Sequence, residues 1–351
     1  FVDIPSPPVP SLLRGFSAPV NISIELSDTD LAFLMTHDSD LFNRWQAANK
    51  FATRAMLQGI ENPSRIEESA HAYALALSAT LADPQLDDAY KAELLRLPNQ
   101  SDIAREKRTN VDPSAIDRTH RAFARATASS LGSGIEAIYA NAASSGPFSP
   151  DAESAGRRAL RNTALTLLSS RGTAADLSRL EAHYVGASNM TEAAHALAIL
   201  ANHDIPARSK ALQHFYDRWH HDHLEIDTWF AAQAQSRLPE TLDNVRALTA
   251  HELFTITTPN KVRALIGTFA LNNPLQFNRD DGAGYEFVAS KVLEIDAKNP
   301  QVAARLLGSF RSYKALEPKR RALATNALQT VSGSAALSRD VREIVLRMLD
   351  D

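Results

Sequence analysis

The stretch at residues 258–269 reads Thr-Pro-Asn-Lys-Val-Arg-Ala-Leu-Ile-Gly-Thr-Phe, and the fold class follows from it. Thr258 before Pro259 is a helix start, because proline fits the first helical turn, where its missing amide donor is not needed. Beyond this start the apolar residues fall at i, i+3, i+4 and i+7, namely Val262, Leu265, Ile266 and Phe269. This spacing predicts an amphipathic helix that buries one face only.

Segments of the same texture, rich in alanine and leucine, run from Ser27 to the end of the chain. Further helix starts are Asn299 before Pro300 and Ser338 before Arg339. Many helices of about 10 to 18 residues joined by short turns are typical of helix pairs stacked into a superhelix. Because we find no fixed repeat period, the sequence predicts an all-α fold, an irregular superhelical solenoid of antiparallel helix pairs.

The N-terminal segment has a different texture. Prolines at positions 5, 7, 8, 10 and 19 exclude helix there, since each removes an amide donor and disfavours helix in the residue before it. Apolar and polar residues then alternate over 20–26, which predicts a strand. No later segment offers this strand a partner. We therefore expect a short extended β arm at 1–26 and a helical domain at 27–351; the alternative is an N-terminal arm lying across the helices.

The composition limits the classes of function. The chain has 351 residues, 44% of them hydrophobic, and a formal net charge of -4. It can bury a sizeable core, but it has no basic excess to bind nucleic-acid phosphates. The absence of cysteine excludes disulfides, thiolate catalysis and cysteine-ligated metals. No apolar stretch reaches the roughly 18 residues that span a bilayer, so we expect a soluble, cytoplasmic protein with no nucleic-acid and no membrane partner. The start at Phe1 suggests processing or a fragment of a longer chain.

One histidine begins a pattern known from zinc hydrolases. Such enzymes place two histidines at i and i+4 of a helix, with a glutamate after the first. His251 and Glu252 start this pattern, but Thr255 stands where the second histidine is required. No phosphate-binding loop, dinucleotide fingerprint or nucleophile elbow is found either. The sequence therefore predicts no catalytic residue and no metal ligand in this chain.

The densest histidine cluster is His220, His221 and His223, flanked by Asp217 and Glu225. On a single helix Asp217, His221 and Glu225 would lie at i, i+4 and i+8 and could form a metal-binding stripe. The favoured interpretation is a solvent-exposed helix end at which carboxylates pair with histidines by charge, because we find no second ligating segment.

Three polar residues are candidates for substrate binding. Gln301 and Arg305 lie one turn apart on the helix that starts after Asn299, so their side chains project from one face. Arg263 adjoins the apolar stripe of its own helix, where its planar guanidinium could bind a carboxylate or a peptide carbonyl. From spacing alone, surface salt bridges are the favoured interpretation of these residues.

Nearly the whole chain resembles the C-terminal portion of the bacterial aminopeptidase N family, the zinc-dependent gluzincin aminopeptidases. The closest segment is Asn-Lys-Val-Arg-Ala-Leu-Ile-Gly at 260–267. Other similar segments follow the same order along the chain and lie at 11–20, 31–35, 44–48, 156–162, 187–191, 217–220, 227–230, 281–285 and 299–306.

The resemblance implies a domain organisation. Members of this family have an N-terminal β-domain, a thermolysin-like zinc domain, a small β-sandwich and a large helical C-terminal domain. Residues 1–26 resemble the end of a truncated β-sandwich domain, and residues 27–351 resemble the helical C-terminal domain. The zinc-binding helix and the exopeptidase loop of the family have no counterpart here, so the resemblance implies zinc in the parent enzyme and no cofactor in this chain.

The resemblance also implies a role. In such enzymes the helical domain closes over the catalytic domain, and the positions matching Arg263, Gln301 and Arg305 hold the peptide beyond the scissile bond. We therefore expect a non-catalytic domain of a zinc aminopeptidase, a metallopeptidase, that is inactive alone and closes the active-site chamber. Its expected partners are the peptide substrate and the catalytic domain of the same parent chain. The alternative is an independent helical solenoid that binds a peptide or protein partner.

Overall fold

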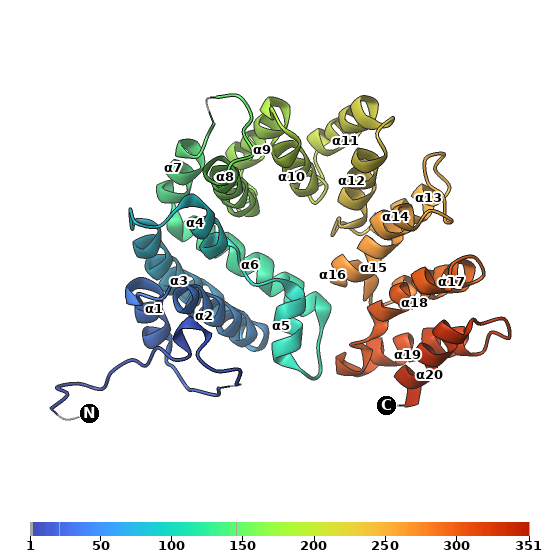
Figure 1. The fold of residues 1–351 in the computed structure, drawn as a ribbon, viewed down its shortest axis with the longest axis horizontal. Coiled ribbons are helices and arrows are strands. Elements are labelled where there is room, and N and C mark those ends of the chain that lie inside the picture. Colours follow the sequence, from blue (N-terminus) through green and yellow to red (C-terminus); the bar gives the residue numbers. More distant parts are fainter. Residues whose placement is uncertain (1–2, 21, 145, 351) are drawn as a thin grey trace. The chain divides into compact units, whose positions relative to one another are not determined.

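The computed structural model describes residues 3–20, 22–144 and 146–350, and most of them lie in α-helices (Figure 1). Within these residues the only β pairing is an isolated parallel bridge between Val111 and Leu316. The prediction of an all-α chain is therefore confirmed. None of the helices in the described ranges is both long and apolar enough to cross a bilayer.

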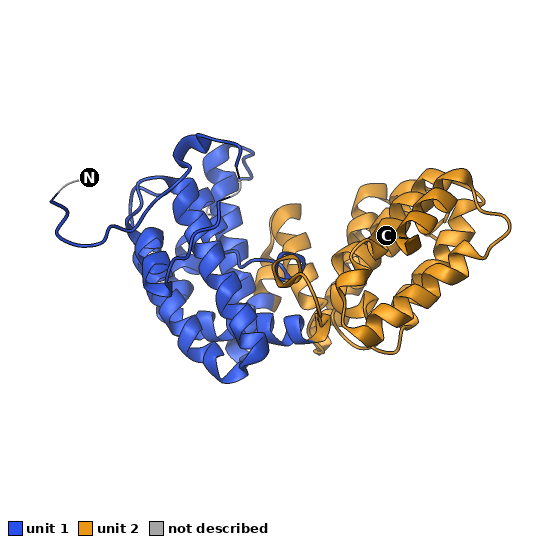
Figure 2. Ribbon diagram, turned by 90° about the horizontal axis from the view of Figure 1, so that it is seen from below, with its two compact units in different colours: residues 1–103, 115–180 blue, residues 104–114, 181–351 orange. Residues whose placement is uncertain are grey.

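The chain divides into two compact units (Figure 2). Unit 1 comprises residues 1–103 and 115–180, and unit 2 comprises residues 104–114 and 181–351. The segment 104–114 thus belongs to unit 2, although the sequence on either side of it belongs to unit 1.

Unit 1 is a set of helices in which sequence neighbours pack on one another, as α1 does on α2 and α7 on α8, and in which α4 also packs on α8, remote in sequence. Three aromatic side chains from different helices meet in its core. The ring of Tyr73 lies 5.7 Å from that of Phe51 and 5.5 Å from that of Phe123, and burial raises the pKa of Tyr73. The elements that begin in unit 1 are η1 (Arg14–Phe16), α1 (Asp28–His37), α2 (Leu41–Glu61), η2 (Pro63–Arg65), α3 (Ile66–Leu81), α4 (Asp88–Leu95), α5 (Gln100–Lys107), α7 (Ser133–Asn141), α8 (Ala152–Ser170) and α9 (Ala174–Gly186).

The described part of the N-terminal arm pairs with no strand. Residues 20 and 22–26 form no β ladder with any described residue, and Asn21, within the predicted strand, lies outside the described residues. Instead, Arg54 of α2 donates a hydrogen bond to the carbonyl of Leu26 at 2.6 Å. The assignment of residues 1–26 to the end of a β-sandwich stays a prediction.

Unit 2 follows the same packing rule, since α10 packs on α11, α17 on α18 and α19 on α20. The predicted helix starts are confirmed: Asn299 accepts a hydrogen bond from the amide of Val302 at 3.2 Å, and Ser338 accepts one from Val341 at 3.3 Å. The elements that begin in unit 2 are α6 (Pro113–Leu131), α10 (Met190–Leu200), α11 (Pro206–Trp219), α12 (His223–Ala234), α13 (Thr241–Leu248), α14 (Pro259–Val262), η3 (Arg263–Gly267), α15 (Thr268–Asn272), α16 (Pro274–Phe277), α17 (Ala283–Asp296), α18 (Pro300–Leu307), η4 (Gly308–Phe310), η5 (Tyr313–Ala315), α19 (Pro318–Ser332) and α20 (Arg339–Asp350).

The stretch 258–269 is helical, but it differs from the prediction in two ways. Its middle, η3, is a turn of π-helix rather than α-helix. The predicted stripe is buried, yet residues 264–270 are all buried, so burial is not confined to one face. The physical reason is that η3 packs against α12 and α13 as well as against its neighbours along the chain. Arg263 alone among residues 261–270 is exposed.

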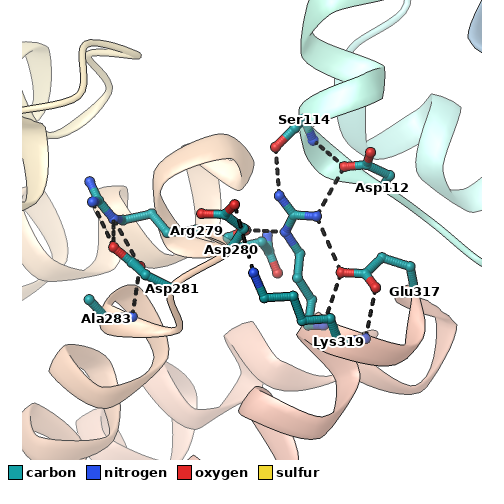
Figure 3. Close-up of polar contacts among 10 residues, drawn as sticks. Asp112, Ser114, Arg279, Asp280, Asp281, Ala283, Glu317 and Lys319 are labelled. Carbon is teal, nitrogen blue, oxygen red and sulfur yellow. Dashed lines mark hydrogen bonds and ion pairs between the residues drawn. The ribbon is translucent and has the colours of Figure 1, made fainter.

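The turn between α16 and α17 depends on two glycines. Gly282 has φ 78°, a left-handed conformation that favours glycine. A Cβ atom on Gly284 would lie 2.3 Å from the carbonyl oxygen of Phe277, so no larger residue fits without displacing backbone. In the same turn Arg279 donates to Asp281 at 2.8 Å and holds the pKa of that carboxyl below its usual range (Figure 3).

Arg320 on α19 joins three separate segments of unit 2, and Figure 3 labels its partners Asp112, Ser114 and Glu317. Its Nε donates to the carbonyl of Asn278 at 2.6 Å, and its Nη2 donates to the hydroxyl of Ser114 at 2.6 Å. Its Nη1 bonds Asp112 at 3.1 Å and Glu317 at 3.3 Å. The side chain is only 8% exposed, and the two carboxylates offset the cost of burying its charge.

We expect Arg320→Met to lower the free energy of unfolding by about 2 to 4 kcal/mol, because it removes the buried guanidinium that bonds two carboxylates and a carbonyl. Urea denaturation of the 351-residue chain, followed by helical circular dichroism, measures this loss. The matched control is Arg347→Met, which breaks a pair with Glu343 whose side chains are 70% and 60% exposed. The control should change stability by less than about 0.5 kcal/mol, and equal small losses for both variants would contradict the structural role of Arg320.

Candidate functional site

The helix α18 presents two of the three candidate residues. Its core-facing residues Ala303, Leu306 and Leu307 are buried, whereas Gln301 and Arg305 are exposed. The helix is therefore amphipathic, and its polar face carries an amide and a guanidinium one turn apart.

Arg263 is the first residue of η3 and projects into solvent, although the residues that follow it are buried. The backbone carbonyl of Arg263 accepts a hydrogen bond from the amide of Thr268, five residues on, and another from the Thr268 hydroxyl at 3.2 Å. Single π-helical turns recur at functional sites in other proteins. Here the turn combines a buried backbone with one exposed cationic side chain.

The three candidates share one property: the polar groups of their side chains are available to bind a ligand. Within the described ranges the side chains of Arg263, Gln301 and Arg305 form no hydrogen bond and no ion pair with each other or with another residue. The surface salt bridges favoured from spacing alone are therefore not formed. Gln301 and Arg305 are brought together by α18, whereas no bond links Arg263 to either. Such groups can bind a carboxylate or carbonyl oxygens from solvent.

Lys261 is a residue of this region that sequence reasoning missed. It is only 7% exposed, and its Nζ lies 2.7 Å from Oδ1 of Asp227 on α12. The signal was present in the helical period, because Lys261, Leu265 and Thr268 lie at i, i+4 and i+7 and are all buried. A lysine with a buried ammonium requires a charged or hydrogen-bonding partner, and that partner is remote in sequence.

The histidine cluster lies across a break between two helices. α11 ends before His221 and α12 begins after Asp222, whose side chain accepts a hydrogen bond from the amide of Leu224 at 2.8 Å. Asp217 and Glu225 are thus on different helices, so the metal-binding stripe proposed for a single helix is wrong. The physical reason is the cap, since Asp222 starts a new helix there. The pKa of Glu225 is raised, mainly by burial and secondly by the negative charge of Asp222.

His251 belongs to an aromatic cluster. Its ring lies 5.5 Å from those of Tyr216 and Trp229 and 5.8 Å from that of Phe230. Its Nδ1 accepts a hydrogen bond from the amide of Leu253 at 3.1 Å. These contacts are those of a packed ring in a turn outside any helix.

No group of three or more histidine, aspartate or glutamate side chains in the described part of the chain is placed to hold a metal ion. The described residues therefore do not fit a zinc site.

Comparison with known proteins agrees with this fold. A family model described as DUF3458_C, a domain of unknown function with ARM repeats, matches residues 28–350. The chain belongs to this family. ARM repeats are stacked helices, so the match supports the predicted all-α solenoid for this DUF3458_C chain.

Two curated relatives are named aminopeptidase N. The chain is 39% identical to that of Caulobacter vibrioides over 351 residues, which are 99% of the chain and 40% of the relative. It is 36% identical to that of Escherichia coli K12 over 344 residues, which are 97% of the chain and 39% of the relative. The DUF3458_C chain thus spans about 40% of the length of these relatives and corresponds to their C-terminal portion, as the resemblance predicted.

A solved structure shares the fold. The crystal structure of Legionella pneumophila aminopeptidase A, determined in complex with aspartic acid, matches with a TM-score of 0.87 at 29% sequence identity. The match covers 98% of the DUF3458_C chain and 41% of the other chain.

Because the side chains of Arg263, Gln301 and Arg305 are exposed and have no bonded partner in the described ranges, we expect their replacement by alanine to leave the fold intact. Each single variant should change the free energy of unfolding by less than about 0.5 kcal/mol. Urea denaturation of the three variants beside the parent chain measures this. A loss above about 1 kcal/mol at any position would show that its side chain stabilises the fold rather than remaining free for a ligand.

Proposed function

We propose that this chain is the non-catalytic C-terminal domain of a zinc aminopeptidase, which closes the active-site chamber and positions peptide substrates. One observation carries the proposal. At least 97% of the chain aligns, at 39% and 36% identity, with aminopeptidase N relatives that are more than twice its length. The proposed partners are the catalytic domain of the same parent chain and the peptide whose N-terminal residue is removed. A cytoplasmic location and the absence of nucleic-acid and membrane partners remain predictions.

In this proposal the catalytic groups and the substrate-positioning groups lie in different domains of the parent enzyme. In the parent enzyme, bound zinc would supply an activated water for hydrolysis, and the groups that hold zinc lie outside this chain. Arg263, Gln301 and Arg305 would hold peptide oxygens beyond the scissile bond. A guanidinium presents two parallel donors to a carboxylate, so the C-terminal carboxylate of a short peptide is a suitable ligand. Holding that end orients the substrate and makes its reaction effectively intramolecular.

If the catalytic groups lie elsewhere, the isolated 351-residue chain should not hydrolyse an aminoacyl-anilide, even with added zinc. The assay compares the purified chain with the full-length parent at equal concentration. Turnover by the chain that persists through purification would contradict the proposal, because it would require a catalytic site within these residues.

Arg305→Ala in the full-length parent should reduce kcat/KM for a tripeptide by about tenfold more than for an aminoacyl-anilide. A charge-assisted hydrogen bond contributes about 1.5 to 3 kcal/mol, and the anilide lacks the residues that this side chain would bind. The control is Arg347→Ala on α20, which should leave both substrates unaffected. Equal losses for the two substrates with Arg305→Ala would exclude a contact beyond the cleaved bond.

A further inference from the structure

The buried ammonium of Lys261 is held by one face of α12. Besides Asp227, its Nζ bonds the backbone carbonyl of His223 at 3.2 Å and lies 5.9 Å from the ring centroid of Phe230. These three partners are at i, i+4 and i+7 of α12 and so lie on one side of that helix. A carboxylate, a carbonyl oxygen and the face of an aromatic ring thus stabilise the positive charge of Lys261.

Few other polar contacts hold the start of this segment. α14 is a helix of only four residues, and Thr258 at its N-cap makes no side-chain hydrogen bond to it. Pro259 at the first position has no amide donor. Among the described residues, the two bonds from Lys261 to Asp227 and His223 are therefore the main polar contacts between α14 and the rest of unit 2.

The backbone that follows Arg263 is also held in place. The carbonyl of Arg263 is bound by both the amide and the hydroxyl of Thr268. The next three residues are buried, with Leu265 and Ile266 at 0% exposure. The backbone of Arg263 thus lies between a buried ion pair two residues before it and a doubly bonded π turn after it. Its side chain is the exposed part of this rigid element.

We propose that Lys261 is a positioning residue that acts through Arg263. By tying α14 to α12, it fixes the direction in which the Arg263 guanidinium projects toward the peptide. This inference rests on the proposed function, because it assigns Lys261 a role only if Arg263 binds substrate. The ammonium group of Lys261 is buried against α12, so in this proposal it does not contact the ligand itself.

A double-mutant cycle in the full-length parent tests this role. The variants are Lys261→Met, which keeps the length of the side chain but removes its charge, Arg263→Ala, and the two combined. Each is assayed on a tripeptide and on an aminoacyl-anilide. Lys261→Met should raise KM for the tripeptide by about three- to tenfold, with kcat and anilide turnover nearly unchanged. In the Arg263→Ala background the same change should have no further effect.

A structural readout accompanies the kinetics. Amide hydrogen exchange over residues 263–268 should be faster in Lys261→Met than in the parent, because the tie before the π turn is lost. The matched control is Arg208→Met, which removes another partly buried pair of unit 2, that with Glu240 at 2.8 Å. This control should alter neither the tripeptide KM nor exchange over 263–268.

The outcomes separate the two claims. If Arg263→Ala leaves tripeptide turnover unchanged, the proposed function of Arg263 fails and the role of Lys261 fails with it. If Arg263→Ala selectively impairs tripeptide turnover but Lys261→Met has no effect on it, only the positioning role is overturned. The same conclusion follows if the losses from the two single variants multiply in the double variant. An equal loss on both substrates with Lys261→Met would show that the pair serves stability alone.

Discussion

Unit 2 depends on the burial of one guanidinium. Arg320 lies 208 residues from Asp112 in the sequence, yet the two are joined by an ion pair at 3.1 Å. Two backbone hydrogen bonds run beside it, from the amide of Val111 to Ala315 and from the amide of Glu317 to Val111. Closing so long a stretch of chain costs conformational entropy, and the several bonds made by a single planar side chain offset part of that cost. The segment 104–114 consequently belongs to unit 2 and not to the unit that surrounds it in sequence.

The cations of unit 2 fall into two groups with different physical roles. Arg320 and Lys261 are buried, and each is surrounded by acceptors from segments remote in sequence. Arg263 and Arg305 are exposed, and in the described ranges their donors have no bonded partner. A buried charge that loses its partner destabilises the fold, whereas an exposed charge retains its water and can exchange it for a ligand. The buried cations therefore stabilise the fold, whereas under the proposed function the exposed ones would bind the substrate, so the two roles can be tested separately.

Under the proposed function, the element around Arg263 would prepare that side chain for binding. An exposed arginine has many rotamers, and ordering it on binding costs free energy. Fixing its backbone on both sides leaves only the side chain itself to be ordered on binding. The π turn contributes because its wider hydrogen bonding gives the Arg263 carbonyl two partners on Thr268. The buried pair between Lys261 and Asp227 contributes from the preceding residues.

Much of the local structure was predictable from sequence. The helix starts at Asn299 and Ser338, the burial of the stripe from Val262 to Phe269 and the all-α class all follow from capping residues and helical period, which act over a few neighbouring positions. Arg263, Gln301 and Arg305 were candidates from their helix positions, and their proposed role in substrate binding comes from the family resemblance. The division into two units, the partners of Lys261 and Arg320 and the π turn were decided only by tertiary structure. Each of these depends on groups far apart in sequence, and local periodicity carries no information about which remote acceptor a buried charge will meet.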